Sequence, residues 1–224
     1  MNTILKISAM AVSILAASFA TTTASAAENP VDEAGIQHNM YLGCLQSTGE
    51  SADDSLVRLV EKCGFDPGMP LDEFVKTYQP VIEMDPTLLL SEKMSPYRER
   101  FSAYEFSFYE RIDDVVMSAG DTKQADAMLA AIESEAIAKL DHKTDNGANI
   151  LGTLSVARHS LRYWSAYSVA HGDGSAMGNT ASRMRWWKWL LVAGADAAGF
   201  ALTENIGTAA SASETVYNWL NKTQ

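Results

Sequence analysis

Cysteine is scarce in this chain, which has only Cys44 and Cys63 among its 224 residues. Two cysteines do not complete a structural zinc site, and no histidine lies at zinc-finger spacing from them. Long segments that alternate apolar and polar residues are also missing, which excludes a β-sheet core. Apolar residues instead recur every three or four positions, so the sequence predicts an all-α fold.

Recognisable catalytic motifs are absent as well. None of the four histidines belongs to a His-Glu-x-x-His pair or follows a glutamate at helical spacing, which excludes the zinc-protease and helical di-iron patterns. The glycine-rich stretch at 172–178 matches neither a nucleotide-binding loop nor the turn that carries a hydrolase serine. We predict no metal and no cofactor. We expect the protein to bind an unidentified protein or small ligand rather than to act as an enzyme.

Basic residues are few, since 17 Lys and Arg face 28 Asp and Glu, a formal net charge of −11 at pH 7. An acidic surface repels phosphate groups. This balance excludes nucleic acid as an expected partner and argues against anionic membranes as a general one.

The N-terminus has the features of a secretory signal peptide over residues 1–26. Lys6 precedes an apolar run at residues 7–20, and small residues follow up to Ala26. The apolar run is too short to span a bilayer comfortably. We therefore expect cleavage after Ala26, export to the periplasm or the medium, and a single helical domain at residues 27–224.

Export affects the two cysteines, because disulfides form and persist in oxidising compartments. We predict a Cys44–Cys63 bond, and the alternative is a pair of buried thiols that pack as small apolar groups. Closing a loop of about 20 residues would stabilise the fold by about 3 kcal/mol in the chain-entropy model.

Helix start and stop signals predict an irregular bundle of five or six main helices. In the first helix the expected apolar line is Ile36, Met40 and Cys44. The clearest amphipathic helix is expected to start at Ser95, with Asp113 on its solvated face. The expected helical segments are residues 29–47, 53–63, 71–78, 95–115, 121–140, 149–171 and 182–212.

We expect the chain to be organised around the C-terminal helical segment at about residues 182–212. It opens with Trp186, Trp187 and Trp189 among bases, and residues 193–201 are almost all small. Small side chains let another helix approach closely.

One acidic residue, Asp196, interrupts this run of small residues. A helical projection places Gly199 and Gly207 on the same stripe as its carboxylate.

The same segment supports an alternative, a membrane-active and bacteriocin-like protein whose three tryptophans sit at a bilayer interface. Asp196 counts against this alternative, because an aspartate at the centre of a spanning helix costs about 2.5 to 3.5 kcal/mol. We favour a helix buried in the core of a soluble protein.

The candidate polar site joins His38, Asn39 and Asp196, with His159 or Arg158 as a further member. If the first helix packs on the small-residue face, His38 and Asp196 meet away from water and hold each other charged. The favoured interpretation is a buried pair that fixes helix register. The alternative is a hydrolase that uses this pair, which requires an open pocket beside a serine. A further alternative leaves Asp196 solvated.

The opening Asn29-Pro30-Val31-Asp32-Glu33-Ala34-Gly35-Ile36-Gln37-His38-Asn39 resembles the pattern N-P-x-D-x-x-G-x-x-H-N of small exported bacterial proteins of unknown function. The helix at 155–164, which ends in Tyr-Trp, and the aspartate, glycine and alanine at 196–199 are similar to later parts of those proteins. The resemblance implies that His38, Asn39 and Asp196 belong to one architecture, and it implies no activity.

Overall fold

The computed structural model describes residues 28–48, 54–170 and 180–222, and within the last range the side chains from 187 to 221. The expected signal peptide and the glycine-rich stretch at 172–178 lie outside these residues, as does the side chain of Trp186.

The described part of the chain is 81% helical and contains no strand. Of its nine α-helices, six have 16 residues or more, which confirms the predicted all-α, irregular bundle of five or six main helices. A 3₁₀ helix, η2, joins α4 to the loop before α5. The helices are α1 (Glu33–Thr48), α2 (Ser55–Glu61), α3 (Leu71–Ile82), α4 (Leu90–Met94), η2 (Ser95–Arg100), α5 (Ala103–Ser118), α6 (Thr122–Lys139), α7 (Asp145–Ala170), α8 (Thr180–Thr203) and α9 (Ile206–Lys222).

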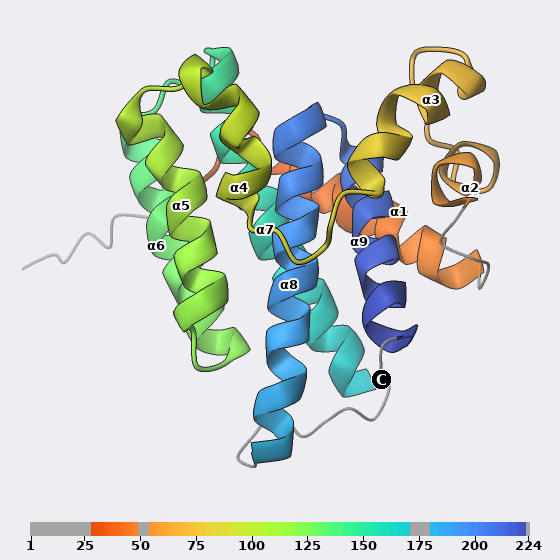
Figure 1. The fold of residues 1–224 in the computed structure, drawn as a ribbon. Coiled ribbons are helices and arrows are strands. Elements are labelled where there is room, and N and C mark those ends of the chain that lie inside the picture. Colours follow the sequence, from red (N-terminus) through yellow and green to blue (C-terminus); the bar gives the residue numbers. More distant parts are fainter. Residues whose placement is uncertain (1–27, 49–53, 171–179, 223–224) are drawn as a thin grey trace, which may run out of the picture.

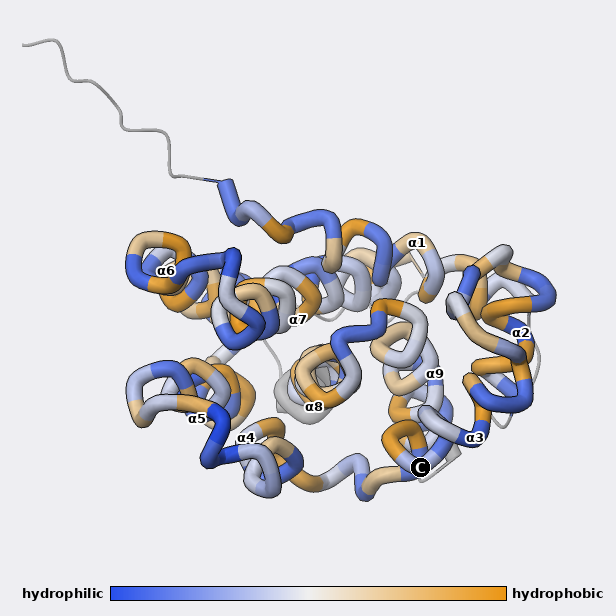
Figure 2. The backbone as a smooth tube through the Cα atoms, turned by 90° about the horizontal axis from the view of Figure 1, so that it is seen from above, coloured by the Kyte–Doolittle hydropathy of each residue, from blue (hydrophilic) through white to orange (hydrophobic). Residues whose placement is uncertain are grey.

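Helix α8 lies in the middle of the bundle (Figures 1 and 2). Seen from above, α4, α5 and α6 lie to one side of it and α1, α2, α3 and α9 to the other, while α7 runs beside it. Most of its residues from Leu190 to Ala201 are buried. A helix that is apolar or small on all sides is stable only when neighbours surround it, so this composition explains the central position.

The small residues of α8 permit the predicted close packing. A Cβ atom on Gly199 would lie 2.9 Å from the Cα atom of Ala209 in α9, closer than real Cβ contacts. The backbones of α8 and α9 therefore approach each other at a distance that only glycine allows at this position.

The segment expected at about 182–212 consists of two helices. Helix α8 ends at Thr203, Glu204 has a left-handed φ of 52°, and α9 starts at Ile206. The chain turns here because the Asn205 side chain accepts a hydrogen bond from the amide of Thr208 (3.0 Å), as a helix-capping residue does. Gly207 is therefore in α9, and its predicted place on the Asp196 stripe is wrong.

The predicted apolar line of the first helix is also wrong. Ile36 and Met40 are 48% and 57% exposed, whereas Gly35, His38 and Leu42 are buried. The buried face of α1 contains a glycine and a histidine because it packs against polar and small residues of α7, α8 and α9. Hydropathy alone selects the opposite face.

The aromatic helix begins later than predicted. Residues 95–100 form η2, and α5 starts at Ala103, where the Ser102 hydroxyl accepts a hydrogen bond from the amide of Glu105. Asp113, expected on the solvated face, is buried and accepts hydrogen bonds from two amides at the start of α4, those of Leu90 and Ser91, each at 2.8 Å. Burial raises the pKa of its carboxyl, and these hydrogen bonds act in the opposite direction.

The predicted disulfide is present between Cys44 in α1 and Cys63 just after α2, with Cα atoms 5.8 Å apart. A buried ion pair connects α2 to α9. Arg58 in α2 meets Glu214 in α9 at 2.5 Å, and both side chains are 3% exposed. Helix α2 is thereby fixed to both α1 and α9.

Candidate functional site

Asp196 lies in the second half of α8 and is fully buried. Its Oδ2 atom accepts hydrogen bonds from the hydroxyls of Ser160 in α7 and Ser213 in α9, the latter at 2.9 Å. The indole of Trp164 in turn donates to the Ser213 oxygen at 3.1 Å. The carboxyl therefore connects three helices through two serines.

His38 brings α1 to the same point. Its Nε2 atom lies 3.6 Å from Oδ2 of Asp196, and both side chains are fully buried. Its Nδ1 atom lies 3.0 Å from the Asn39 side-chain oxygen, and the Asn39 amide group donates to the backbone carbonyl of His159 at 2.8 Å. The structure thus brings together His38, Asn39 and Asp196, the three residues at the centre of the predicted site.

Burial decides the charge of this pair. It lowers the pKa of His38 from 6.5 to about 4, although the Asn39 hydrogen bond acts the other way. It raises the pKa of Asp196 well above its usual range, although the hydrogen bonds from Ser160 and Ser213 oppose this. Both shifts favour the uncharged form of each group, which goes against the expectation that the two groups hold each other charged. The contact joins neutral groups.

Asn39 also fixes which atom of the imidazole carries the proton. Because its side-chain nitrogen donates to a carbonyl, its oxygen faces Nδ1 of His38, and Nδ1 donates to that oxygen. In the neutral ring Nε2 is then an acceptor, directed toward the carboxyl of Asp196. The Nε2 and Oδ2 atoms are 3.6 Å apart, which is longer than a hydrogen bond.

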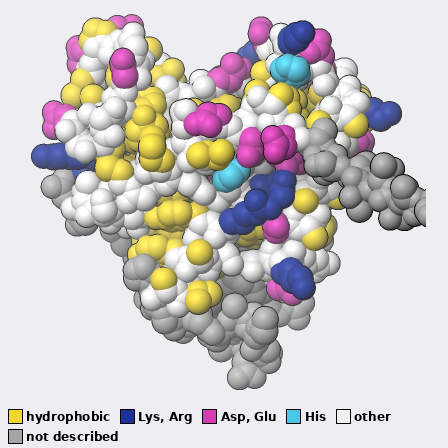
Figure 3. All heavy atoms as spheres, turned by 180° about the vertical axis from the view of Figure 1, so that it is seen from behind, with side chains coloured by type: hydrophobic (Ala, Val, Ile, Leu, Met, Phe, Trp, Pro, Cys, Tyr) yellow, Lys and Arg dark blue, Asp and Glu magenta, His cyan; other side chains and the backbone are white. Residues whose placement is uncertain are grey.

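His159 and Arg158 belong to other contacts. His159 in α7 lies 3.0 Å from the Asp32 carboxylate, and both side chains reach the surface. Arg158 faces α6, where it pairs with Glu133 and lies 3.7 Å from Asp126. Figure 3 shows basic, acidic and histidine side chains gathered on the face that includes α1, α6 and α7.

The residues of the N-terminal pattern dock α1 and the turn before it onto α7. The Asn29 amide donates to Glu133 (2.8 Å) and to the backbone carbonyl of Leu151 (2.9 Å). A Cβ atom on Gly35 would lie 2.6 Å from the carbonyl oxygen of Ser155, and the Ser155 hydroxyl donates to Asp32. In this chain the pattern therefore describes one helix-packing surface.

This polar core has no catalytic geometry. The serine hydroxyls contact the carboxyl of Asp196 rather than the imidazole of His38, so no base is positioned to activate them. His38, Ser160 and Ser213 are all 0% exposed, and a substrate has no access to them. Among the described residues no group of three His, Cys, Asp or Glu side chains is placed to hold a metal ion.

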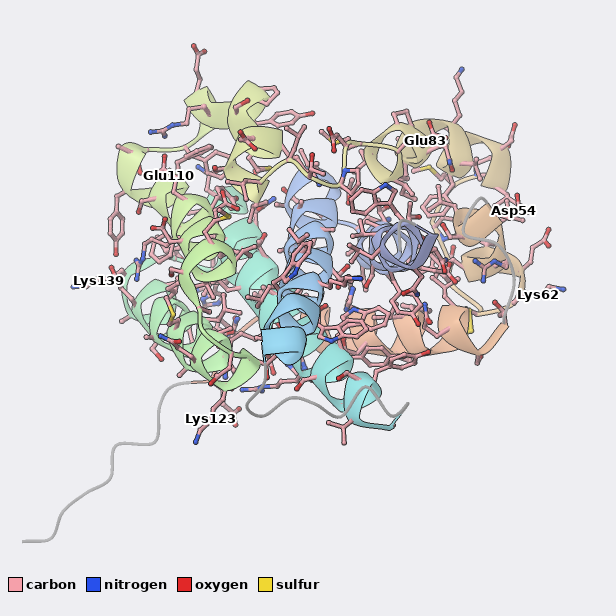
Figure 4. All side chains as sticks on the ribbon, turned by 60° about the horizontal axis from the view of Figure 1, so that its bottom comes forward. Asp54, Lys62, Glu83, Glu110, Lys123 and Lys139 are labelled. Carbon is pink, nitrogen blue, oxygen red and sulfur yellow. A yellow bond between two sulfur atoms is a disulfide. The ribbon has the colours of Figure 1, made fainter. Side chains whose placement is uncertain are left out.

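A groove of about 560 Å³ lies on the surface between the start of α6 and the second half of α7. Its rim carries an ion pair between Arg162 and Asp126, at 2.9 Å. Lys123 points away from the body of the protein at one end (Figure 4). The groove is lined by Thr122, Lys123, Asp126, Leu161, Arg162, Ser165, Ala166, Val169 and Ala170.

The two described tryptophan side chains of α8 lie in different surroundings. The ring of Trp189 stacks on that of Trp164, with centroids 5.3 Å apart, whereas Trp187 is 36% exposed. None of the described helices combines the length and apolarity that a membrane crossing requires.

Sequence reasoning missed Ser160, Ser213 and the groove. The two serines lie on helix faces rich in small residues. There the sequence does not distinguish a serine that forms a hydrogen bond from one that is present only because it is small. The groove is lined by residues of both α6 and α7, so it depends on how two helices pack, which no local sequence pattern records.

Known protein families, curated proteins and solved structures offer no match to this chain.

Proposed function

We propose that this protein is an exported binding protein whose ligand site is the groove between α6 and α7. The Cys44–Cys63 bond supports export, because such bonds persist in oxidising compartments. The N-terminal sequence supports export on independent grounds. The closed polar core has the role of holding α1, α7, α8 and α9 together.

The groove is the observation that carries the binding role. Its volume of about 560 Å³ lies within the range of small-molecule sites, about 300 to 1,000 Å³. Leu161, Ala166 and Val169 give it an apolar floor, while Thr122 and Ser165 add hydroxyls. This combination suits a small amphipathic molecule with an apolar body and a few polar atoms.

The walls of the groove are held firmly. Asp126 of α6 pairs with Arg162 of α7 at 2.9 Å, and Arg158 reaches both Asp126 and the buried Glu133. A site on two helices fixed in this way is preorganised, which lowers the entropy lost on binding.

Fluorescence titration with anilinonaphthalene sulfonate, a dye with an apolar ring system and a polar head, tests this site on the protein of residues 27–224. Filling the groove with Ala166→Phe or charging it with Val169→Asp should each weaken binding by about tenfold or more. Met40→Gln is the matched control, because Met40 is an exposed apolar residue outside the groove. Equal affinity in all four proteins, with unchanged thermal melts, would reject the groove as the site.

A further inference from the structure

The first turn of α7 contains the only asparagine of the chain that is followed by glycine, in the pair Asn146-Gly147. Such a pair is chemically unstable wherever the chain is open. The backbone nitrogen of the second residue attacks the side-chain carbonyl carbon of the asparagine, and glycine hinders this approach least because it has no side chain. The sequence therefore places its most reactive amide at the start of α7.

Packing requires the glycine of this pair. Gly147 is buried, and a Cβ atom on it would lie 2.1 Å from the backbone carbonyl oxygen of Asp141, in the loop before α7. The loop and the helix therefore approach each other at a distance that only glycine allows here. Asn146 is thus followed by its most reactive neighbour for a structural reason.

In the folded chain, hydrogen bonds hold both reacting groups. The amide of Gly147 donates to the Thr144 hydroxyl oxygen at 3.1 Å. The side-chain amide of Asn146 donates to the backbone carbonyl of Arg100, at the end of η2, at 2.8 Å, and it also forms a hydrogen bond with the Glu105 side chain. The Gly147 nitrogen becomes a nucleophile only after it loses its proton, and the Asn146 side chain must leave η2 to reach it. Both steps require the first turn of α7 to open.

We propose that Asn146 is a site of covalent modification that reacts only when the first turn of α7 opens. The Gly147 nitrogen gives its proton to hydroxide and forms a bond to Cγ of Asn146. The bond between Cγ and the side-chain nitrogen then breaks, and that nitrogen takes a proton from water and leaves as ammonia. A further water opens the resulting five-membered succinimide ring at either carbonyl, which gives aspartate or isoaspartate. The sum is one water consumed and one ammonia released, with no oxidation or reduction.

The products fit the folded structure poorly. A carboxylate at position 146 does not donate to the Arg100 carbonyl, and it adds a negative charge close to Glu105. Isoaspartate also lengthens the backbone by one carbon before Gly147, where the Asp141 carbonyl leaves no room for an added atom. A chain that carries isoaspartate therefore does not rebuild the first turn of α7, and the modification is a lasting record that this end of the helix has opened.

Peptide mass mapping tests the proposal on the protein of residues 27–224 with its disulfide intact. The protein is incubated in mildly alkaline buffer with and without guanidinium chloride, and the conversion of Asn146 from amide to acid is followed over time. Conversion should be slower in the folded protein by about tenfold or more, because it requires local opening. Equal rates in the two conditions would overturn the proposal, and so would an amide that persists in guanidinium chloride.

A matched pair of variants at Thr144 tests whether the first turn controls the rate. Thr144→Ala removes the acceptor of the Gly147 amide and should speed conversion in the folded protein by about threefold or more, with the rate in guanidinium chloride unchanged. Thr144→Ser keeps a hydroxyl and should react like the wild type. Equal rates in the two folded variants would overturn the control of this reaction by the first turn.

Thermal melts test the effect of the products. Wild-type chains that have reacted in guanidinium chloride and are returned to buffer should melt at a lower temperature than chains kept folded. Asn146→Gln is the matched control, because its longer side chain closes the ring much more slowly, and its melting temperature should be the same before and after this treatment. An unchanged melting temperature in fully converted wild-type chains would show that the products fit the fold, and would overturn the role of the modification as a record of opening.

Discussion

At the scale of single residues, the main feature is a carboxyl kept inside a closed core. Asp196 meets two serines and a histidine from three neighbouring helices, and none of these side chains reaches solvent. Burying such a group costs free energy unless partners satisfy it, so the value of the cluster lies in fixing which helices meet and in what register.

The contact between His38 and Asp196 predicts coupled effects of mutation. Asp196→Ala and His38→Ala should each destabilise the protein by about 1 to 3 kcal/mol, because each leaves a buried polar partner unsatisfied. The double variant should cost clearly less than the sum of the two. Chemical denaturation of all four proteins measures this, and strict additivity would show that the two side chains do not interact.

The depressed pKa of His38 predicts a stability loss on acidification. The unfolded residue takes up a proton near pH 6.5, whereas the folded one stays neutral down to about pH 4. Between these values the unfolded chain binds more protons, so the free energy of unfolding rises with pH across this window and falls on acidification, by up to about 3 kcal/mol. His38→Gln should remove this slope in melts at pH 4 to 7.

Asp196 contributes with the opposite sign. Its raised pKa makes the folded state bind more protons than the unfolded state above pH 3.8, so its contribution to stability falls as pH rises through the folded pKa. In Asp196→Asn the free energy of unfolding should therefore fall less than in the wild type as the pH is raised. A profile unchanged in both variants would show that neither group titrates differently on folding.

Sequence reasoning selected His38, Asn39 and Asp196 because a lone aspartate among small residues must meet a partner. It did not predict that His38 and Asp196 are uncharged, because the burial of each side chain depends on how four helices pack together. Nor did it place Arg158, which neighbours His159 in sequence but faces α6. Adjacent residues on a helix point about 100° apart. Two consecutive residues therefore need not belong to the same site.

At the scale of helices, α1 is fitted to α7 by glycine. A Cβ atom on Gly35 would lie 2.5 Å from the His159 ring and 2.6 Å from the Ser155 carbonyl oxygen. The same addition at Gly43, two turns further along α1, meets only Tyr163 at 3.9 Å. The packing around α1 therefore leaves room for a Cβ atom at Gly43 but not at Gly35.

This difference gives a matched pair of mutations. Gly35→Ala should destabilise the protein by about 1 to 3 kcal/mol, because α1 must move away from α7. Gly43→Ala should be neutral or stabilising by up to about 1 kcal/mol, because alanine favours helix. Thermal melts of both variants test the prediction, and similar shifts in the two would contradict the close contact at Gly35.

Helix existence could be predicted from periodicity, whereas helix faces and ends could not. The pattern from Ser95 runs across η2 and α5 without a break, since aromatic residues keep their spacing through the turn at Ser102. The boundary at Glu204 depends on one capping side chain, that of Asn205. Such local hydrogen bonds change the path of the chain while leaving its hydropathy unaltered.

At the scale of the whole molecule, the fold depends on α8. It contacts α3, α4, α5, α7 and α9, and it supplies Asp196 to the polar core. A chain of residues 27–178, which lacks α8 and α9, should therefore show no cooperative unfolding transition, whereas residues 27–224 should show one. Circular dichroism during heating distinguishes them, and a sharp transition in the shorter chain would mean that the remaining helices form a core of their own.

The central position of α8 also sets when the molecule can fold during its synthesis. A ribosome releases the chain from its N-terminus, and α1 to α7, the seven α-helices described before α8, emerge first. Until residues 180–203 follow, the apolar faces of α4, α5 and α7 lack the helix they enclose. Translation therefore leaves these apolar faces without their central partner until α8 has been synthesised.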